Sequence, residues 1–216
     1  MNKNASFLII VTLVLFGLPK VYSQQAHKNQ NHTKGAWKLL FDGATLNGWQ
    51  IHGTEKWEVK DGVIIASSGP DKGYGYLATE KSYYNFRLEL QFRLESDGNS
   101  GVFFRSNLKG TDITGWQVEV APPGENTGGI YESGGRGWLF EIPDNKEGIL
   151  KAGKWNKLKV ELIGSRVKTW LNGELMTDLT DDAIGKGSGK IALQVHSGGD
   201  VAVQWRSIRI MELPSN

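Results

Sequence analysis

Strict alternation of apolar and polar residues is the feature that most constrains how this chain can fold. Residues 86–94, FRLELQFRL, place an apolar side chain at every second position and a charged or amide side chain between them. Successive side chains of a β-strand point to opposite faces of a sheet, so this pattern predicts a strand with one buried and one polar face. Further strands are expected at 63–67, 101–106, 116–121, 158–163, 167–171, 191–196 and 201–211.

Turn-forming residues separate these expected strands. The chain contains 28 glycines, and Asn172-Gly173 predicts a two-residue hairpin, because a type I′ turn needs positive φ at both central positions. After about residue 23 no stretch has the length and period of a long amphipathic helix, and only 181–184 predicts a short helical turn. The sequence therefore predicts an all-β fold, a two-sheet antiparallel jelly-roll sandwich whose curved outer surface suits an extended polar ligand.

The first 23 residues (1–23) have the organisation of a secretory signal peptide. Lys3 precedes an apolar run at 7–18, and Val21-Tyr22-Ser23 is a plausible cleavage site. The apolar run is well short of the roughly 20 residues that span a bilayer, so a retained anchor is the weaker interpretation. We expect cleavage of this segment.

A polar stretch, 24–35, follows and predicts a disordered leader before a folded domain at 36–214. The leader carries two histidines, for which a solvated linker is the plainer interpretation and a metal-binding tail the alternative. No metal ligand set is diagnosed anywhere in the sequence, and no cofactor is predicted, although a divalent cation remains compatible with the chain.

Composition excludes several classes of protein. The chain has no cysteine, which excludes a disulfide scaffold, a thiolate zinc site, a cysteine nucleophile and a lipid-modified cysteine anchor. It has 25 basic and 23 acidic residues, and loss of the signal peptide removes Lys3 and Lys20 but no acid. A neutral mature chain predicts no nucleic-acid partner. We expect a periplasmic or secreted protein without a membrane span after cleavage.

Three expected strands carry polar residues on the face opposite their apolar residues. If these strands are neighbours, an acid, an imidazole, a guanidinium and two amides converge on the outside of one sheet. The residues concerned are Arg105, Gln117, Glu119, Gln194 and His196. The alternatives are a cross-strand ion pair between Arg105 and Glu119 and an isolated surface or satisfied histidine at His196.

A glycine-rich segment at 128–140, GGIYESGGRGWLF, predicts a binding loop, because its five glycines make a regular strand hard to sustain. Aromatic rings stack on sugar faces, and charged groups bind sugar hydroxyls. The candidates for substrate binding in this segment are Tyr131, Glu132, Arg136 and Trp138. The alternative is a bulged edge strand with a salt bridge.

Familiar hydrolase motifs are missing from the sequence. It has no GxSxG elbow, no HExxH helix and no EF-hand loop. A laminarinase-type glucanase would carry two or more acids at alternating positions of one strand, whereas the best candidate strand here offers only Glu119. Ordinary retaining glycoside hydrolysis is therefore disfavoured.

Ten segments, taken together and in order, closely resemble the 3-keto-disaccharide hydrolase family. They are LFDGATLNGW (40–49), WEVKDGVI (57–64), NFRLELQFRL (85–94), GNSGVFFR (98–105), GWQVEV (115–120), GGIYESGGRGWL (128–139), GKWNKLKVE (153–161), WLNG (170–173), IALQVHSG (191–198) and WRSIRI (205–210). The resemblance covers about 37–213. It implies a concanavalin-A-like (lectin/glucanase) fold in an exported protein of a carbohydrate-degrading bacterium.

The resemblance also implies a chemistry that needs only one acid, the cleavage of glycosides oxidised at C3. A ketone at C3 acidifies the C2–H bond, so one base removes that proton and the C1 substituent leaves by β-elimination. The implied substrate is an oligosaccharide or another glycoside. The positions that match the family are Arg105, Glu119, Tyr131, Gln194 and His196. Our hypothesis assigns either His196 or Glu119 as the base, and Arg105 and Gln194 near the developing oxyanion. Tyr131 either positions the ring or donates a proton.

Two other functions remain open from the sequence. A non-catalytic carbohydrate-binding module would bind sugar without turnover, through Tyr131 and Trp138. A purely structural or adhesion domain would have no convergent polar cluster.

Overall fold

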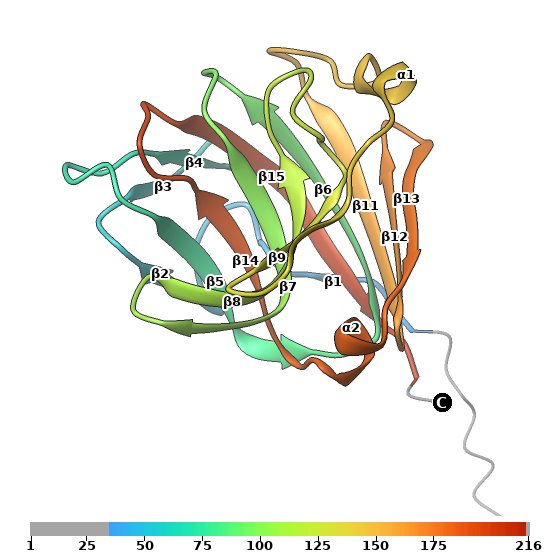
Figure 1. The fold of residues 1–216 in the computed structure, drawn as a ribbon. Helices are drawn as coiled ribbons and strands as arrows, with labels where there is room; N and C mark the ends of the chain where they lie inside the picture. Colours follow the sequence, from blue (N-terminus) through green and yellow to red (C-terminus); the bar gives the residue numbers. More distant parts are fainter. Residues whose placement is uncertain (1–34, 215–216) are drawn as a thin grey trace, which may run out of the picture. The chain divides into compact units, whose positions relative to one another are not determined.

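The structure, a computed structural model, describes residues 35–214, which form two antiparallel β-sheets that face each other (Figure 1). This arrangement confirms the predicted all-β sandwich. The expected signal peptide at 1–23 and all but the last residue of the expected leader at 24–35 lie outside the described residues.

The first sheet has eight strands in the order β13-β12-β11-β6-β15-β4-β3, with β1 paired to β15. Its strands are β1 (Lys38–Leu39), β3 (Lys56–Lys60), β4 (Val63–Ser67), β6 (Phe86–Leu94), β11 (Asn156–Ile163), β12 (Arg166–Leu171), β13 (Glu174–Thr180) and β15 (Ala202–Glu212).

The second sheet has seven strands in the order β10-β9-β8-β7-β14-β5-β2. Its strands are β2 (Trp49–His52), β5 (Gly75–Tyr83), β7 (Ser100–Lys109), β8 (Asp112–Val120), β9 (Ile130–Ser133), β10 (Gly137–Phe140) and β14 (Gly189–Val195). Two short helices, α1 (Asp144–Glu147) and α2 (Asp182–Lys186), lie in the connections.

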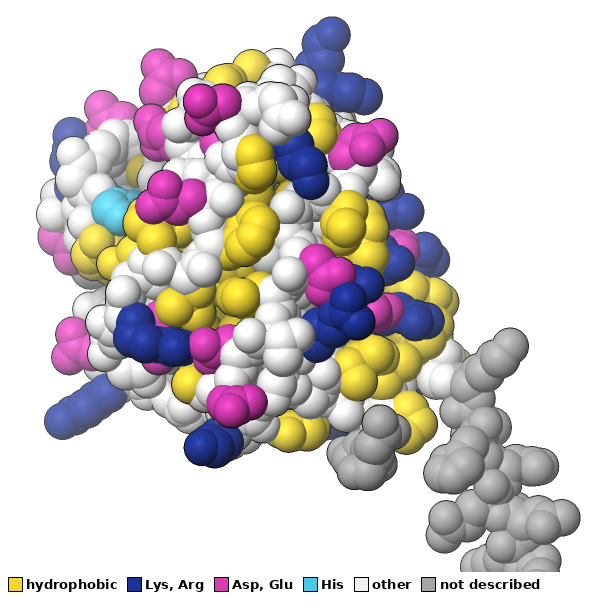
Figure 2. Space-filling view, turned by 45° about the vertical axis from the view of Figure 1, so that its right-hand side comes forward, with side chains coloured by type: hydrophobic (Ala, Val, Ile, Leu, Met, Phe, Trp, Pro, Cys, Tyr) yellow, Lys and Arg dark blue, Asp and Glu magenta, His cyan; other side chains and the backbone are white. Residues whose placement is uncertain are grey.

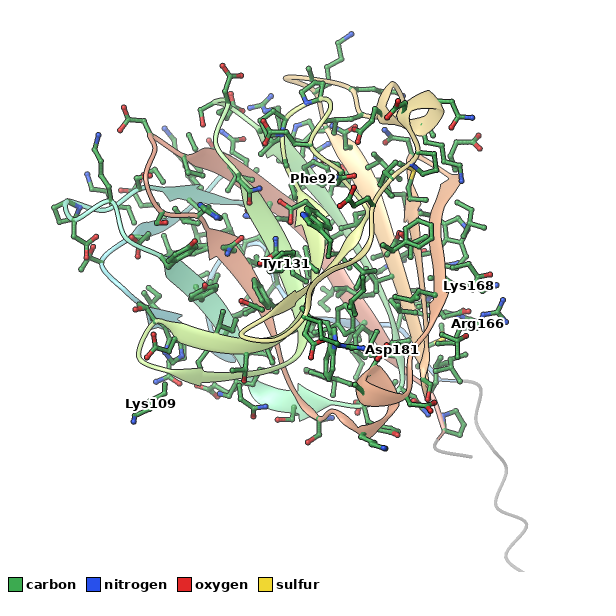
Figure 3. All side chains as sticks on the ribbon, viewed as in Figure 1. Phe92, Lys109, Tyr131, Arg166, Lys168 and Asp181 are labelled. Carbon is green, nitrogen blue, oxygen red and sulfur yellow. The ribbon has the colours of Figure 1, made fainter. Side chains whose placement is uncertain are left out.

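The core lies between the sheets and follows from the alternation in the sequence. Strand β6 has the predicted bounds, and its apolar residues are buried while the residues between them are partly exposed. Phe92, labelled in Figure 3, packs against Trp205 of β15, with ring centroids 6.0 Å apart. Removal of such apolar area from water is the main driving force for the sandwich.

Local turn and cap chemistry also follows the sequence. Asn172 and Gly173 both have positive φ and form the two-residue turn between β12 and β13. Helix α2 begins after Asp181, whose carboxylate accepts hydrogen bonds from the backbone N–H groups of Ala183 and Ile184. Strand β5 was not predicted, because residues 75–79 are buried on both faces and do not alternate.

Strand β7 contains a β-bulge that the sequence alternation did not predict. Its register with β8 shifts between Phe104 and Asn107, so that Arg105 and Ser106 lie opposite a single residue, Gly115. Arg105 has φ +49°, in the left-handed region that non-glycine residues seldom adopt. The extra residue ends the strict alternation, and Arg105 leaves the outer face of the sheet.

The guanidinium of Arg105 binds backbone carbonyls at one end of the sandwich. Its Nη2 donates to the Tyr84 carbonyl at 2.9 Å, and its Nη1 donates to the carbonyls of Gly164, at 2.9 Å, and Ile184. The Tyr84 ring lies 4.2 Å from the guanidinium carbon. Arg105 is only 1% exposed, and burial lowers its pKa. The prediction that Arg105 stands by the developing oxyanion is therefore wrong.

Beyond the bulge, the end of the β7–β8 hairpin packs on the outer face of the second sheet. Ile113 of this hairpin is buried in a small apolar cluster separate from the main core. The other buried members of this cluster are Tyr76, Ala78, Phe103 and Ala192. The hairpin end thus forms a wall above the outer face.

Replacing Arg105 with methionine should lower the free energy of unfolding by about 3 kcal/mol, because one buried and two partly buried carbonyls lose their donor. The matched control is Arg166→Met on β12 (Arg166 is labelled in Figure 3), which removes a surface ion pair with Asp178 of β13 and should change stability by less than about 1 kcal/mol. Urea unfolding of both variants measures the difference. Equal stability of the two variants would contradict the structural role of Arg105.

Candidate carbohydrate-binding groove

The polar residues of the outer face lie side by side because β7 pairs with β8 on one side and with β14 on the other. The antiparallel register aligns two cross-strand rows on this face. The first row contains Tyr76, Gln194, Gly101 and Glu119. The second row contains Ala78, Ala192, Phe103, Gln117 and Tyr131. Adjacent members of a row are on strands about 4.8 Å apart, so these side chains share one surface.

A groove of about 570 Å³ runs over these rows. Apart from Arg105, Glu132 and Arg136, every predicted site residue lines it: Gln117, Glu119, Tyr131, Trp138, Gln194 and His196. Tyr74, Tyr76, Asn99 and the hairpin residues 111–114 line it as well. A space of this size, with aromatic, amide and acidic walls, suits a small polar ligand.

Glu119 is the buried acid of the groove, with 3% of its surface exposed. Asn99 Nδ2 donates a hydrogen bond to one carboxylate oxygen, and Gln117 Nε2 donates to the other at 2.6 Å. Burial raises the pKa of Glu119 to about 7, although both hydrogen bonds act to lower it. Close to neutral pH this carboxyl group therefore both accepts and releases a proton readily.

Gly101 provides the space in which the acid is held. A side-chain carbon at position 101 would lie 2.5 Å from Gln117 Nε2, closer than carbon and nitrogen atoms approach without a bond. Glycine therefore lets the Gln117 amide lie over β7 and reach Glu119. The Gln117 amide thus covers Gly101, which lies between Glu119 and Gln194 in the row.

His196 lies at one end of the groove in a defined tautomer. Its Nδ1 is 2.9 Å from the carbonyl oxygen of Ser197, which only accepts hydrogen bonds, so Nδ1 carries a proton. Its Nε2 is 3.2 Å from the hydroxyl of Tyr74, which donates to it when the imidazole is neutral. The two rings also meet edge to face, with centroids 4.7 Å apart.

Gln194 and Tyr76 form the floor on the other side of Gly101. Gln194 is 3% exposed, and its Oε1 has no hydrogen-bond partner among the described residues. Burial raises the pKa of Tyr76 to about 12, with the Gln194 amide acting in the opposite direction, so the phenol keeps its proton. Both side chains can therefore hydrogen-bond to a ligand.

The glycine-rich segment forms an edge hairpin, β9–β10, and not a loop. Tyr131 and Trp138 are cross-strand partners that meet edge to face, with centroids 5.3 Å apart, and Trp138 is 38% exposed. A register shift after Trp138 marks a bulge. The alternative interpretation, a bulged edge with a salt bridge, describes this segment better.

Glu132 and Arg136 are not brought into the groove, contrary to the prediction. Glu132 alternates with Tyr131 along β9 and so faces the other way. Arg136 pairs with Glu132 and binds Asp181 through two hydrogen bonds of 2.8 and 3.0 Å. These contacts raise the pKa of Arg136 and tie the β9–β10 turn to the start of α2, near the Asp181 label in Figure 3.

Sequence reasoning missed Asn99, Tyr74 and Tyr76. Asn99 precedes β7 in a turn signal, and its carbonyl accepts a hydrogen bond from the His196 backbone N–H. The alternation rule applied to β7 would have placed Asn99 and Gly101 on the same face, two residues apart. The two tyrosines belong to or precede β5, the strand that was not predicted.

Two further features describe the surface. On the face visible in Figure 2, basic and acidic side chains are interspersed, with apolar side chains exposed among them. Within residues 35–214, no three His, Asp or Glu side chains converge as a metal-binding group, and no helix is long and apolar enough to cross a membrane.

Comparison with known proteins places this groove in a family. The model of a 3-keto-alpha-glucoside-1,2-lyase-like domain matches residues 36–211. A 3-keto-disaccharide hydrolase of Bacteroides thetaiotaomicron is 36% identical over 74 residues, which cover 30% of this chain and 26% of that protein. The matched part is thus about a quarter of the length of this curated relative.

Solved structures share the fold. A proposed glycosyl hydrolase from Parabacteroides distasonis superposes with a TM-score of 0.62 at 24% identity, over 82% of this chain and 100% of the other. The carbohydrate-binding module CBM66 of Bacillus subtilis gives 0.60 at 19% identity, over 76% and 96%. The Bacillus licheniformis β-glucanase gives 0.58 at 14% identity, over 83% and 98%.

The family match and the groove indicate a carbohydrate-active protein, either a glycoside-acting enzyme or a carbohydrate-binding protein. Since the family model covers most of the chain, the protein belongs to the 3-keto-alpha-glucoside-1,2-lyase-like domain family.

Proposed function

We propose that the protein cleaves glycosides oxidised at C3, and that Glu119 is the base that removes the C2 proton. The observation that carries this proposal is one buried carboxyl group that lines the groove, has a pKa of about 7 and is held by two amides. A general base works best when its pKa lies near the working pH. His196, the other candidate base, has its Nε2 occupied by the Tyr74 hydroxyl.

The proposed reaction balances with one base and one acid. The Glu119 carboxylate takes the proton from C2, and the electron pair of the C2–H bond delocalises into the C3 carbonyl as an enolate. Collapse of the enolate forms a C1–C2 double bond and breaks the bond from C1 to the glycosidic oxygen. That oxygen leaves with a proton from an acid in the groove. Water added across the double bond gives hydrolysis; without it the outcome is that of a lyase.

Tyr76 and Gln194 replace Arg105 as the groups that stabilise the enolate oxygen. They are in the same cross-strand row as Glu119, so a sugar ring bound above this row has C2 near Glu119 and C3 nearer to Gln194 and Tyr76. Since the high pKa of Tyr76 keeps it protonated, its hydroxyl is a neutral donor aimed into the groove. Gln194 contributes its amide from the same row.

Tyr131 and His196 lie on opposite sides of the reacting ring in this proposal. Tyr131 is the cross-strand neighbour of Gln117, so it is placed to protonate the departing oxygen or to position its ring. His196 and Tyr74 close the other end, where the Tyr74 hydroxyl donates to His196 Nε2 and accepts a hydrogen bond from a hydroxyl of the reacting ring. We also propose that the protein acts in the periplasm or outside the cell, because of the signal-like segment 1–23.

A second candidate function is carbohydrate binding without turnover. The edge-to-face pair of Tyr131 and Trp138 is an aromatic wall of the kind that stacks on sugar rings, and CBM66 shares the fold. Product analysis by mass spectrometry after incubation with native and 3-keto disaccharides separates the two functions. Binding with no product from either sugar would favour the binding module.

The variant Glu119→Gln should lower kcat/KM on a 3-keto-glucoside by about a thousandfold, because it removes the base and keeps the shape of the side chain. His196→Ala should lower it by roughly ten- to a hundredfold, since it removes a positioning group. The matched control is Glu174→Gln on β13, an exposed acid of the other sheet that does not line the groove. Steady-state kinetics with wild-type rates in both Glu119→Gln and His196→Ala would remove the site assignment.

Activity should rise with pH through a midpoint near 7, because Glu119 must be ionised to accept the C2 proton. Asn99→Ala removes a hydrogen bond to the ionised form and should move this midpoint up by about one unit. The same ascending limb should persist in the residual activity of His196→Ala, which distinguishes Glu119 from the imidazole. The pH profile of kcat/KM measures this, and a shift to lower pH in Asn99→Ala would speak against Glu119 as the base.

A further inference from the structure

We propose that Glu55 and the backbone carbonyl of Tyr74 belong to a calcium site beside the groove. The site joins the segment that follows β2 to the residue that precedes β5. It is separate from the cleavage reaction and does not depend on it. The bound ion holds the backbone at Tyr74, which is one of the residues that line the groove.

Glu55 is a buried carboxylate without a partner. Only 4% of the residue is exposed, and neither Oε1 nor Oε2 has a hydrogen-bond partner within residues 35–214. Glu119, the other buried acid of this part of the chain, is bonded at both oxygens. A buried carboxylate without a donor or a counter-charge is costly, and a bound cation removes that cost.

Two glycines let this carboxylate lie against the backbone. A side-chain carbon at either Gly53 or Gly75 would overlap Oε2 of Glu55. The carbon added at Gly53 would also lie 2.8 Å from the carbonyl oxygen of Tyr74, so Oε2 and this oxygen are neighbours around one point. An ionised carboxylate and a carbonyl only accept hydrogen bonds, so neither satisfies the other. Two acceptors placed together in this way are ligands for a cation.

The oxygen ligands select calcium. Calcium takes about six to eight oxygens from carboxylates, backbone carbonyls and water, in a flexible geometry. Magnesium demands a near-ideal octahedron, and zinc prefers nitrogen and sulfur ligands. Residues 35–214 contain no group of three His, Asp or Glu side chains that would hold such a metal. Because the site has one carboxylate, we expect weak binding, with a dissociation constant of about 1 mM.

The calcium ion acts on the groove through Tyr74. The hydroxyl of Tyr74 is 3.2 Å from His196 Nε2 at the end of the groove. The segment before Tyr74 is already tied to the segment after β2, because Thr54 Oγ1 donates to Asp71 at 2.5 Å. The ion between Glu55 and the Tyr74 carbonyl extends this link to Tyr74 itself, so the end of the groove is fixed before a sugar binds.

Calcium should stabilise the protein through Glu55. After treatment with EDTA, 10 mM calcium chloride should raise the midpoint of thermal unfolding of wild type by about 4 °C over sodium chloride of equal ionic strength. Glu55→Gln keeps the shape of the side chain and removes its charge, so its midpoint should move by less than about 1 °C. The matched control is Glu58→Gln, an exposed acid on β3, which should keep the full shift.

The order of stability should reverse when calcium is removed. Without the ion, Glu55→Gln should unfold at a higher temperature than wild type, because the amide carries no unpaired charge and can donate to the Tyr74 carbonyl. With the ion, wild type should be the more stable protein. Wild type that is the more stable of the two without calcium would overturn the unpaired charge on which the site depends.

Calorimetric titration with calcium gives a direct measurement of binding. Wild type should bind one ion per chain, and Glu55→Asp, which keeps the charge and shortens the side chain, should bind it about tenfold more weakly. No calcium-dependent shift in wild type, or equal shifts in wild type and Glu55→Gln, would overturn the site. A shift of the same size with magnesium chloride would overturn calcium as its cation. None of these measurements involves turnover, so failure of the proposed cleavage reaction leaves them unaffected.

Discussion

The bulge in β7 determines both parts of the groove, which are the floor formed by the two cross-strand rows and the wall formed by the end of the β7–β8 hairpin. Before the bulge, strict alternation keeps Gly101 and Phe103 on the outer face, in register with Glu119 and Gln117 on β8. After it, the same two strands turn and place Ile113 on the outer face as a wall. Arg105 stabilises the change of direction by binding three carbonyls at the end of the sandwich. A continuous strand would have given a flat surface, open at this end.

The pKa of Glu119, the acid at the centre of the groove, is set by a balance of opposing effects. Burial disfavours the charged form of Glu119, while the amides of Asn99 and Gln117 favour it, and the result is a pKa of about 7. Burial without the amides would leave a carboxylic acid that is protonated at neutral pH. With both amides but without burial, the carboxylate would be too weakly basic to remove a proton from carbon. Both conditions are needed for proton abstraction at neutral pH.

Much of this architecture was predictable from the residues alone. Period-two alternation in β6, β8 and β14 gave the correct strands and faces, and so brought Gln117, Glu119 and Gln194 onto one surface. The prediction failed for Arg105, because alternation has no signal for a single inserted residue whose backbone is left-handed. It failed for Tyr76 because β5 is buried on both faces at its start and so does not alternate.

Glu132 and Arg136 show a second limit of sequence reasoning. Their segment has the composition of a binding loop, but its partner, Asp181, lies 45 residues from Arg136 along the chain. Nothing in the local pattern reveals a long-range ion pair of this kind. Alternation along β9 puts Tyr131 and Glu132 on opposite faces of the sheet. A strand predicted for this segment would have given that result from the sequence.

The glycine at position 101 makes the chemistry sensitive to a single methyl group that would not itself touch the substrate. A methyl there would displace the Gln117 amide, and Glu119 would keep its burial while losing one of its two donors. A glycine within a strand usually weakens it, but here the missing side chain helps to set the basicity of Glu119. Substitution of Gly101 by a larger residue would therefore change the pH range in which the protein works before it changed the fold.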